Sequence, residues 1–213
     1  MQKNVLGSLA FIFLSLVSLS AQEIEKIPLP EPQRTGGMPL LEALNNRQSQ
    51  RNYSSQALDE QVISSLLWAA YGINREDGRR TAPSAVNWQP FDLYLIMADG
   101  WYVYEPREHA LLKMGNQDLR KHAGSQDFVS AAPLNLIFVS DYDRMTGADP
   151  EILEYNSGRD VGFISQNVYL FCASEGLATV VRGLIDKDAL REVLRLRPSQ
   201  HAVLGQTVGY PGQ

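Results

Sequence analysis

The sequence has little of the side-chain chemistry on which most enzymes depend. It contains one cysteine and three histidines, so an intrachain disulfide is excluded and a zinc site is not favoured. The histidines, His109, His122 and His201, lie far apart and show no metal-ligand spacing. We expect them to be ordinary surface or core histidines and predict no metal site.

Several catalytic motifs are also missing. There is no Gly-x-Ser-x-Gly elbow, no Gly-x-Gly-x-x-Gly stretch and no Walker loop, which argues against an α/β-hydrolase, a Rossmann dehydrogenase and a P-loop NTPase. Cys172 lies in the apolar run "NVYLFCASEG", as is typical of a buried, inert thiol. Asp141 and Asp143 begin an acidic stretch, which we interpret as a solvated loop. Any catalysis is therefore expected to belong to a bound cofactor.

Charge of either sign is modest. Charged residues make up 20% of the chain, the net charge is −5 and the pI is about 5.2, so the composition does not favour nucleic acid or an anionic membrane as a partner. With 213 residues and an apolar share of 44%, the chain is long enough for one domain with a sizeable core.

The first 21 residues have the layout of a secretory signal peptide. Lys3 precedes an apolar run from Val5 to Val17 and then small residues, with cleavage expected near Ser20 or Ala21. The run is too short and too rich in serine for a stable membrane span, although an uncleaved anchor is the alternative. We therefore expect export to the periplasm or the medium.

The rest of the chain divides into an arm and a domain. Residues 22–37 are rich in proline and glycine and are expected to form a leader or linker, and residues 38–213 are expected to form the domain. Apolar periodicity and turn residues predict helices at 38–46, 58–73, 159–176 and 186–196. They predict strands at 91–98, 101–104, 133–141, 177–184 and 201–211, and a loop at 142–158. This mixed order indicates an α+β sandwich.

An alternating basic pattern follows the first helix. Arg47, Ser49 and Arg51 occupy every second position of "RQSQR", so an extended backbone would present all three on one face. Two guanidinium groups and a hydroxyl form a suitable clamp for a phosphate or carboxylate. A solvated charged strand is the alternative that this spacing alone leaves open.

Two further segments invite the same question. Asn87 and Gln89 alternate in "RTAPSAVNWQP" (80–90), where amide groups could meet the polar edge of a flat heterocycle, or where a proline-bounded turn could simply lead into a strand. Gly183 follows the β-branched run "ATVVR" and marks either a close approach of the backbone to a ligand or a bulge.

Taken together and in this order, these segments resemble the FMN-dependent nitroreductase superfamily from about residue 38 to residue 211. The resemblance rests on the motifs "RQSQRNY", "LLWAAYGINR", "RTAPSAVNWQPFDLYLI", "GWYVYEPREHALLKM", "FVSAAPLNLIFVSD" and "SQNVYLFCASEGLATVVRG". The segment "GWYVYEPREHALLKM" is most similar to the SagB-type dehydrogenase branch. The chain ends in "TVGYPGQ", without the basic residue that many relatives carry after Gly-Tyr-Pro, so phosphate binding would depend on Arg47 and Arg51, or on these together with the partner chain.

The resemblance implies a three-layer sandwich with a central antiparallel or mixed sheet, and a homodimer with one FMN at each interface. By position, the phosphate and pyrimidine side of FMN would be held by Arg47, Gln48, Ser49 and Arg51. The segment under the flavin ring would be formed by Pro83, Ser84, Ala85 and Asn87. The backbone of Arg182 and Gly183 would face flavin N5 and O4, and helix 159–176 would lie at the centre of the dimer.

The implied activity is two-electron transfer through flavin N5 to or from a small aromatic or quinone-like molecule, with NAD(P)H or another electron donor. No catalytic side chain is expected, because the cofactor carries the chemistry. Two alternatives remain open at this point. One is an exported dimeric binding or scaffold protein that has lost tight FMN. The other is a flavin-dependent small-molecule dehydrogenase or reductive dehalogenase.

Overall fold

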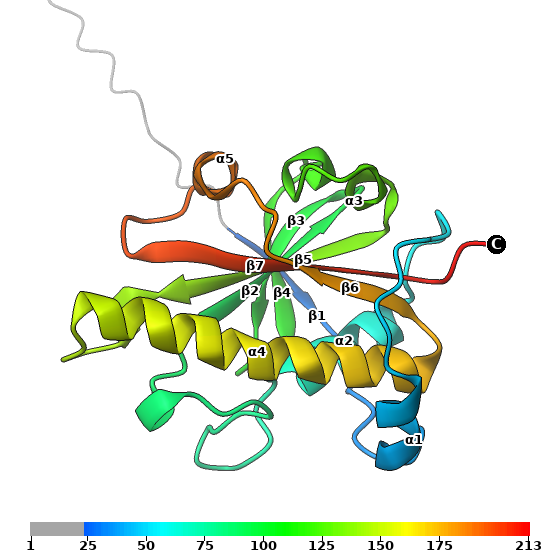
Figure 1. Ribbon diagram of the computed structural model, residues 1–213, viewed down its shortest axis with the longest axis horizontal. Helices are drawn as coiled ribbons and strands as arrows, with labels where there is room; N and C mark the ends of the chain where they lie inside the picture. The colour runs from blue at the N-terminus through cyan, green and yellow to red at the C-terminus, as the bar shows by residue number, and fades with distance from the viewer. Residues whose placement is uncertain (1–23) are drawn as a thin grey trace, which may run out of the picture.

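The computed structural model describes residues 24–213, so the predicted signal peptide lies outside the described residues. A seven-stranded sheet, antiparallel throughout, forms the middle layer (Figure 1), with strand order β1-β4-β3-β2-β5-β7-β6. The strands are β1 (Glu25–Pro28), β2 (Phe91–Met97), β3 (Gly100–Glu105), β4 (Ala110–Gly115), β5 (Leu134–Asp141), β6 (Ala178–Arg182) and β7 (Gln200–Gly209).

Helices cover both faces of this sheet. One face carries α1 (Leu40–Asn46), α2 (Glu60–Tyr71) and α4 (Pro150–Glu175), and the other carries α3 (Asp127–Ala131) and α5 (Lys187–Val193) (Figure 1). The expected α+β three-layer sandwich is therefore confirmed, with a sheet that is antiparallel rather than mixed. Within residues 24–213, no helix is both long enough and apolar enough to span a bilayer.

Each layer boundary has its own apolar cluster. Leu66, Leu136 and Val168 belong to the cluster between the sheet and helices α2 and α4. Ile137 and Leu190 belong to the cluster on the α3 and α5 side. Leu136 and Ile137 are neighbours on β5, and they face opposite layers because side chains alternate along a strand. This explains why β5 is buried along its whole length and why its sequence is mostly apolar, with Asn135, Ser140 and Asp141 as the polar members.

Helix α4 is longer than the sequence pattern indicates. It begins at Pro150 rather than at residue 159, so the prediction of a loop through residues 150–158 is wrong. The acidic residues and Gly158 hide the apolar period there, whereas Asp149 and Pro150 supply a favoured helix start. The helix ends at Gly176, whose positive φ of 68° suits the left-handed cap. Its 26 residues span about 39 Å.

The segment ahead of the domain adds an edge strand to the sheet. Part of the expected leader, β1, pairs antiparallel with β4, with Ile27 opposite Leu111. Beyond β1, the Pro30 carbonyl accepts a hydrogen bond from Ser64 Oγ. Because Ser64 donates there, it must accept from His109 Nε2, 2.8 Å away. This tautomer leaves His109 Nδ1 to accept from Tyr104 Oη at 2.9 Å. The arm is thereby fastened to α2 and to the β3–β4 hairpin.

Candidate functional site

The first predicted binding segment lies along the outer edge of the sheet. Residues 47–51 follow α1 in an extended form, and the Gln50 amide donates to the Thr179 carbonyl of edge strand β6 at 2.9 Å. Ser49 and Arg51 are exposed, and Arg47 is half-buried. Within residues 24–213, neither arginine has a carboxylate within ion-pair distance. Two cations without acidic partners fit the anion clamp that the spacing predicts.

Tyr169 on α4 fixes this segment in place. Its hydroxyl lies 2.7 Å from Ser49 Oγ and accepts a hydrogen bond from the Val181 amide at 3.0 Å. The guanidinium carbon of Arg47 lies 5.2 Å from the centre of the Tyr169 ring, within cation–π range. Sequence reasoning missed Tyr169. The one available signal was a phenol within an apolar helical run, which usually has a polar partner when buried.

Gln48 lies on the same segment beside a small cavity. The cavity has a volume of about 150 Å³ and is lined by Gln48, Gln50, Tyr169 and Thr179, among others. It is too small for a flavin ring and can accommodate a few waters. Gln48 is exposed beside this cavity, and its role toward FMN stays a prediction.

The end of β6 brings Arg182 and Gly183 close to this segment. The β6–β7 register is regular through Arg182, so no bulge accounts for Gly183. A Cβ placed on Gly183 would meet only Leu204 Cδ2, at 3.9 Å, so packing within the chain does not require a glycine there. The open space beside an exposed strand end fits the close backbone approach of a ligand.

The side chain of Arg182 turns inward instead. Its exposure is 4%, and it donates to Thr207 Oγ1 at 3.0 Å, to the Ala123 carbonyl at 2.7 Å and to Asn135 Oδ1 at 3.0 Å. The backbone at position 182 can thus serve the site, whereas the guanidinium sits in the layer beneath it.

The third predicted segment, residues 83–87, has an unusual backbone. Val86, Asn87 and the nearby Gln89 have positive φ values of 39°, 59° and 49°, a conformation that is costly for residues other than glycine. Ser84 Oγ accepts from the Gln89 amide at 2.9 Å. The Ala85 amide donates to Asp160 Oδ2 on α4 at 2.8 Å. The proline-bounded turn is therefore held in a strained shape, a feature often found at binding sites.

This third segment is not close to the other two within one chain. Residues 83–87 contact α4 at Asp160, and residues 47–51 contact it at Tyr169. These positions are nine residues apart, which corresponds to about 14 Å along the helix and 2.5 turns. They therefore project from opposite sides of α4. One chain places residues 47–51 beside β6, the strand that ends at Arg182, and it does not bring in residues 83–87.

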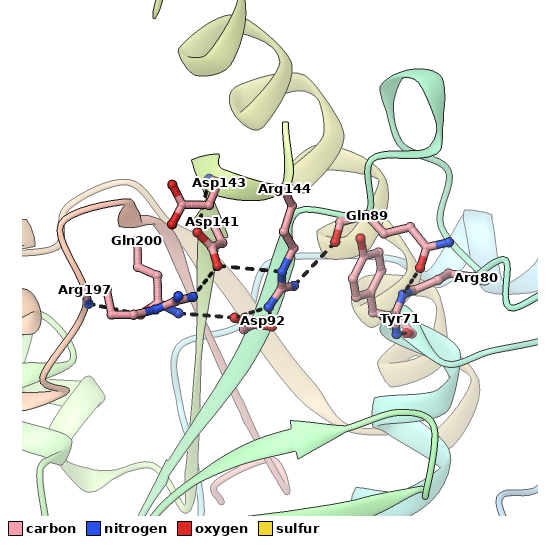
Figure 2. A network of polar contacts seen from close by, with 9 residues as sticks. All are labelled: Tyr71, Arg80, Gln89, Asp92, Asp141, Asp143, Arg144, Arg197 and Gln200. Carbon is pink, nitrogen blue, oxygen red and sulfur yellow. Dashed lines mark hydrogen bonds and ion pairs between the residues drawn. The ribbon is translucent and has the colours of Figure 1, made fainter. Parts of the chain in front are cut away.

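A polar network adjoins the strained turn and holds Gln89 in place (Figure 2). Gln89 Oε1 accepts from Arg80 Nε at 2.9 Å, and Arg80 stacks on Tyr71, with its guanidinium carbon 4.6 Å from the ring centre. Burial lowers the pKa of the Arg80 guanidinium and raises the pKa of Tyr71 to about 12. Gln89 is thus occupied by contacts within the chain, contrary to its suggested role at a ligand edge.

The same network includes Asp141, which the sequence analysis misjudged, whereas Asp143 is exposed as expected. Asp141 is 2% exposed and paired with Arg197, so it is not the solvated carboxylate expected from its loop. Arg144 donates to both oxygens of Asp92, at 2.7 and 2.8 Å. Burial raises the pKa of Asp92, and the charge of Arg144 opposes that rise. These pairs join β2, β5 and the loop before β7, and we interpret them as structural.

Comparison with known proteins identifies the family of the chain. The family model described as "Nitroreductase family" matches residues 44–210. The chain belongs to the nitroreductase family. Membership places it among the flavin-dependent oxidoreductases, and the anion clamp and the open strand end at Gly183 are consistent with that class.

Individual proteins similar to this nitroreductase-family protein are themselves described as nitroreductases or flavin oxidoreductases. It is 32% identical over 182 residues to "Putative nitroreductase MJ1384" of Methanocaldococcus jannaschii, covering 81% of this chain and 90% of the relative. It is 30% identical over 104 residues to an NADPH-flavin oxidoreductase of Vibrio harveyi, covering 45% of this chain and 43% of the relative. A crystal structure from Ralstonia eutropha JMP134, also described as a putative nitroreductase, superposes with a TM-score of 0.84 at 42% identity. That superposition covers 88% of this chain and 90% of the other.

Proposed function

We propose that the protein is a homodimeric, FMN-dependent oxidoreductase that transfers two electrons to or from a small aromatic or quinone-like molecule. The observation that carries the proposal is the placement of Arg47, Ser49 and Arg51 beside edge strand β6, which ends at Arg182 and is followed by the open position of Gly183. When bound there, FMN would supply hydride transfer at N5. The donor is NAD(P)H or another reductant.

The residues at the β6 edge suit FMN in chemical character. Arg47 and Arg51 provide positive charge for a phosphate or for the pyrimidine side of a flavin. Ser49, anchored by Tyr169, adds a hydroxyl. The strand end at Arg182 and Gly183 offers backbone groups to a flat polar edge. In this account the chain binds and orients the cofactor, and no side chain acts as a catalytic acid or base.

A second copy of the chain would complete the site. The strained segment 83–87 projects from the opposite side of α4, so one protomer cannot place it against a ligand at its own β6 edge. Large apolar side chains are exposed nearby, including Leu41 at 80%, Val86 at 79% and Phe163 at 43%. Burying such surfaces between two copies is a common basis for stable dimers. Gel filtration with light scattering is expected to give twice the protomer mass.

The proposal extends to the branch of the family and to the cellular location. Similarity of β3 and β4 to the SagB-type branch suggests a dehydrogenase that acts on a small molecule. The signal-like residues 1–21 suggest export, with a periplasmic or secreted destination. Protease accessibility of a tag, measured on the medium, on intact cells and on cells whose outer envelope has been opened by osmotic shock, would test the location. A tag that stays protected until the cells are lysed would contradict export.

Retention of flavin tests the cofactor assignment directly. The purified protein is incubated with FMN and desalted, and its visible spectrum is recorded. We expect about one FMN per chain for the wild type and for Arg107→Ala, which removes an exposed arginine of the β3–β4 hairpin. We expect at least a tenfold weaker affinity for Arg47→Ala and Arg51→Ala, because each loses a charge-assisted contact. A wild-type protein that binds no FMN would favour the binding or scaffold alternative.

A further inference from the structure

Arg182 differs from the other buried charged side chains in the described part of the protein. The buried charged side chains of residues 24–213 are Asp141, Asp160 and Arg182, which are 2%, 1% and 4% exposed. Asp141 pairs with Arg197, and Asp160 pairs with Arg159. Within residues 24–213, Arg182 has only neutral acceptors and no carboxylate within ion-pair distance. A buried charge without an opposite charge is costly, and proteins usually compensate it.

The fold reserves space for this guanidinium. A Cβ on Gly124 would lie 2.2 Å from Arg182 Nη1, and a Cβ on Gly205 would lie 3.0 Å from Nη2. The loop before α3 and strand β7 therefore each supply a glycine beside the guanidinium: a side chain at position 124 would displace it, and one at position 205 would crowd it. The Thr207 hydroxyl accepts from Arg182 Nε and donates to Asn135 Oδ1 at 2.9 Å, so the hydrogen bonds around the guanidinium are mutually consistent.

No neighbouring group neutralises the charge. Burial lowers the pKa of Arg182 to about 10, so the side chain remains a cation at neutral pH. Tyr53 is the acidic group whose charge would favour that cation. Burial raises the pKa of the Tyr53 phenol, so Tyr53 stays neutral in the same range. The positive charge of Arg182 is thus not balanced by any of residues 24–213, and an anionic ligand could balance it.

The position of Arg182 indicates where that anion would lie. Arg182 is the last residue of β6 and directly precedes Gly183, the open strand end at which the proposed flavin site lies. A flavin gains negative charge when it is reduced and its N1 is deprotonated. We infer that Arg182 acts on the flavin through its charge, without touching it. From the layer beneath β6, its guanidinium stabilises the reduced, anionic flavin relative to the oxidised flavin. This inference rests on the proposed function.

The size of the effect follows from Coulomb's law. With an effective dielectric constant of about 20, a unit charge changes an equilibrium between neutral and anionic states by about tenfold when it lies about 12 Å from the anion, and by more when it lies closer. The ratio of the affinities for reduced and oxidised FMN should fall by that factor. For a two-electron couple, a tenfold change corresponds to a midpoint potential about 30 mV more negative.

Three variants separate this role from a purely structural one. Arg182→Gln removes the charge and keeps a hydrogen-bonding side chain. Arg182→Lys keeps the charge. Asn135→Asp keeps Arg182 and gives it an internal carboxylate partner, which provides a second route to neutralisation if Arg182→Gln fails to fold. Each is measured by anaerobic spectroelectrochemical titration of bound FMN, together with the affinity for oxidised FMN and the melting temperature.

The expected result is a potential about 30 mV lower in Arg182→Gln and in Asn135→Asp, with Arg182→Lys close to the wild type. Losses of thermal stability that leave the potential unchanged would show that Arg182 only ties β5, β6 and β7 together, and would overturn the inference while the proposed function stands. A wild-type protein that fails to bind FMN would overturn both.

Discussion

Replacing Tyr169 by phenylalanine tests the contact that joins the anion clamp to the sheet. The substitution keeps the ring and its stacking with Arg47, and it removes only the hydroxyl. Two hydrogen bonds are lost, one to Ser49 Oγ at 2.7 Å and one from the Val181 amide at 3.0 Å. Ser49 is exposed and can bond to water instead. The half-buried Val181 amide has less access to water, and leaving such a donor unpaired is costly.

These losses set the expected magnitude. We expect the free energy of unfolding to fall by about 1–2 kcal/mol, most of it from the Val181 amide. For a domain of this size, each kcal/mol corresponds to about 2–4 °C in melting temperature, so the transition should move down by roughly 2–8 °C. The affinity for FMN should fall as well, because residues 47–51 lose their anchor on α4.

Thermal denaturation followed by circular dichroism, without and with FMN, measures both effects. Tyr155→Phe is the matched control, since Tyr155 lies on the same helix and is 67% exposed. It should change the melting temperature very little. If Tyr169→Phe melts together with Tyr155→Phe and binds FMN like the wild type, the reasoning about the hydroxyl is refuted.

Two further predictions concern other contacts of the fold. Asp160→Ala removes the acceptor of the Ala85 amide together with the ion pair to Arg159, and should cost about 2 kcal/mol. Arg159→Ala removes the half-exposed partner of that ion pair and its stacking on Tyr155 but leaves the Ala85 hydrogen bond in place, and should cost about 1 kcal/mol. The midpoint in urea at constant slope measures both, and equal losses would contradict the assignment. Burial lowers the pKa of His109 below its ordinary value of 6.5, so protonation favours the unfolded state; stability should fall as pH drops through about 6.5. His109→Gln should flatten that part of the profile in denaturation experiments between pH 7.5 and pH 5, whereas an unchanged slope would assign the effect to other groups.

Apolar periodicity and turn residues correctly predicted the helices and strands whose limits are set by neighbouring residues in the sequence. The hairpin of β2 and β3 follows from apolar strands around Asp99-Gly100, and helix α2 follows from its apolar period. The start of α4 was missed because acidic residues interrupt the apolar pattern, although Asp149 and Pro150 mark a helix start. Strand β1 was missed because its residues do not alternate clearly, and its pairing with β4 is a long-range contact.

In the candidate site, too, spacing in the sequence predicted some features and missed those that depend on long-range contacts. Spacing alone suggested the clamp of Arg47, Ser49 and Arg51, and the structure places these residues at an accessible sheet edge. Spacing could not reveal that the Arg182 side chain turns inward, because this depends on glycines at 124 and 205. It also could not reveal that Gln89 is engaged by Arg80, or that Tyr169 joins two segments far apart in the sequence. Such features are set by tertiary packing.

The pairing of β1 with β4 has a consequence for aggregation. Strand β4 carries the buried Leu111 and would present unpaired backbone groups along its outer side without β1. An open strand edge of this kind is a template for pairing with another molecule. In the complete fold that edge is covered by a short strand with alternating charges, Glu25 and Lys26, and with Pro28 at its end. The four residues of β1 therefore protect the β4 edge from pairing with the sheet of another molecule.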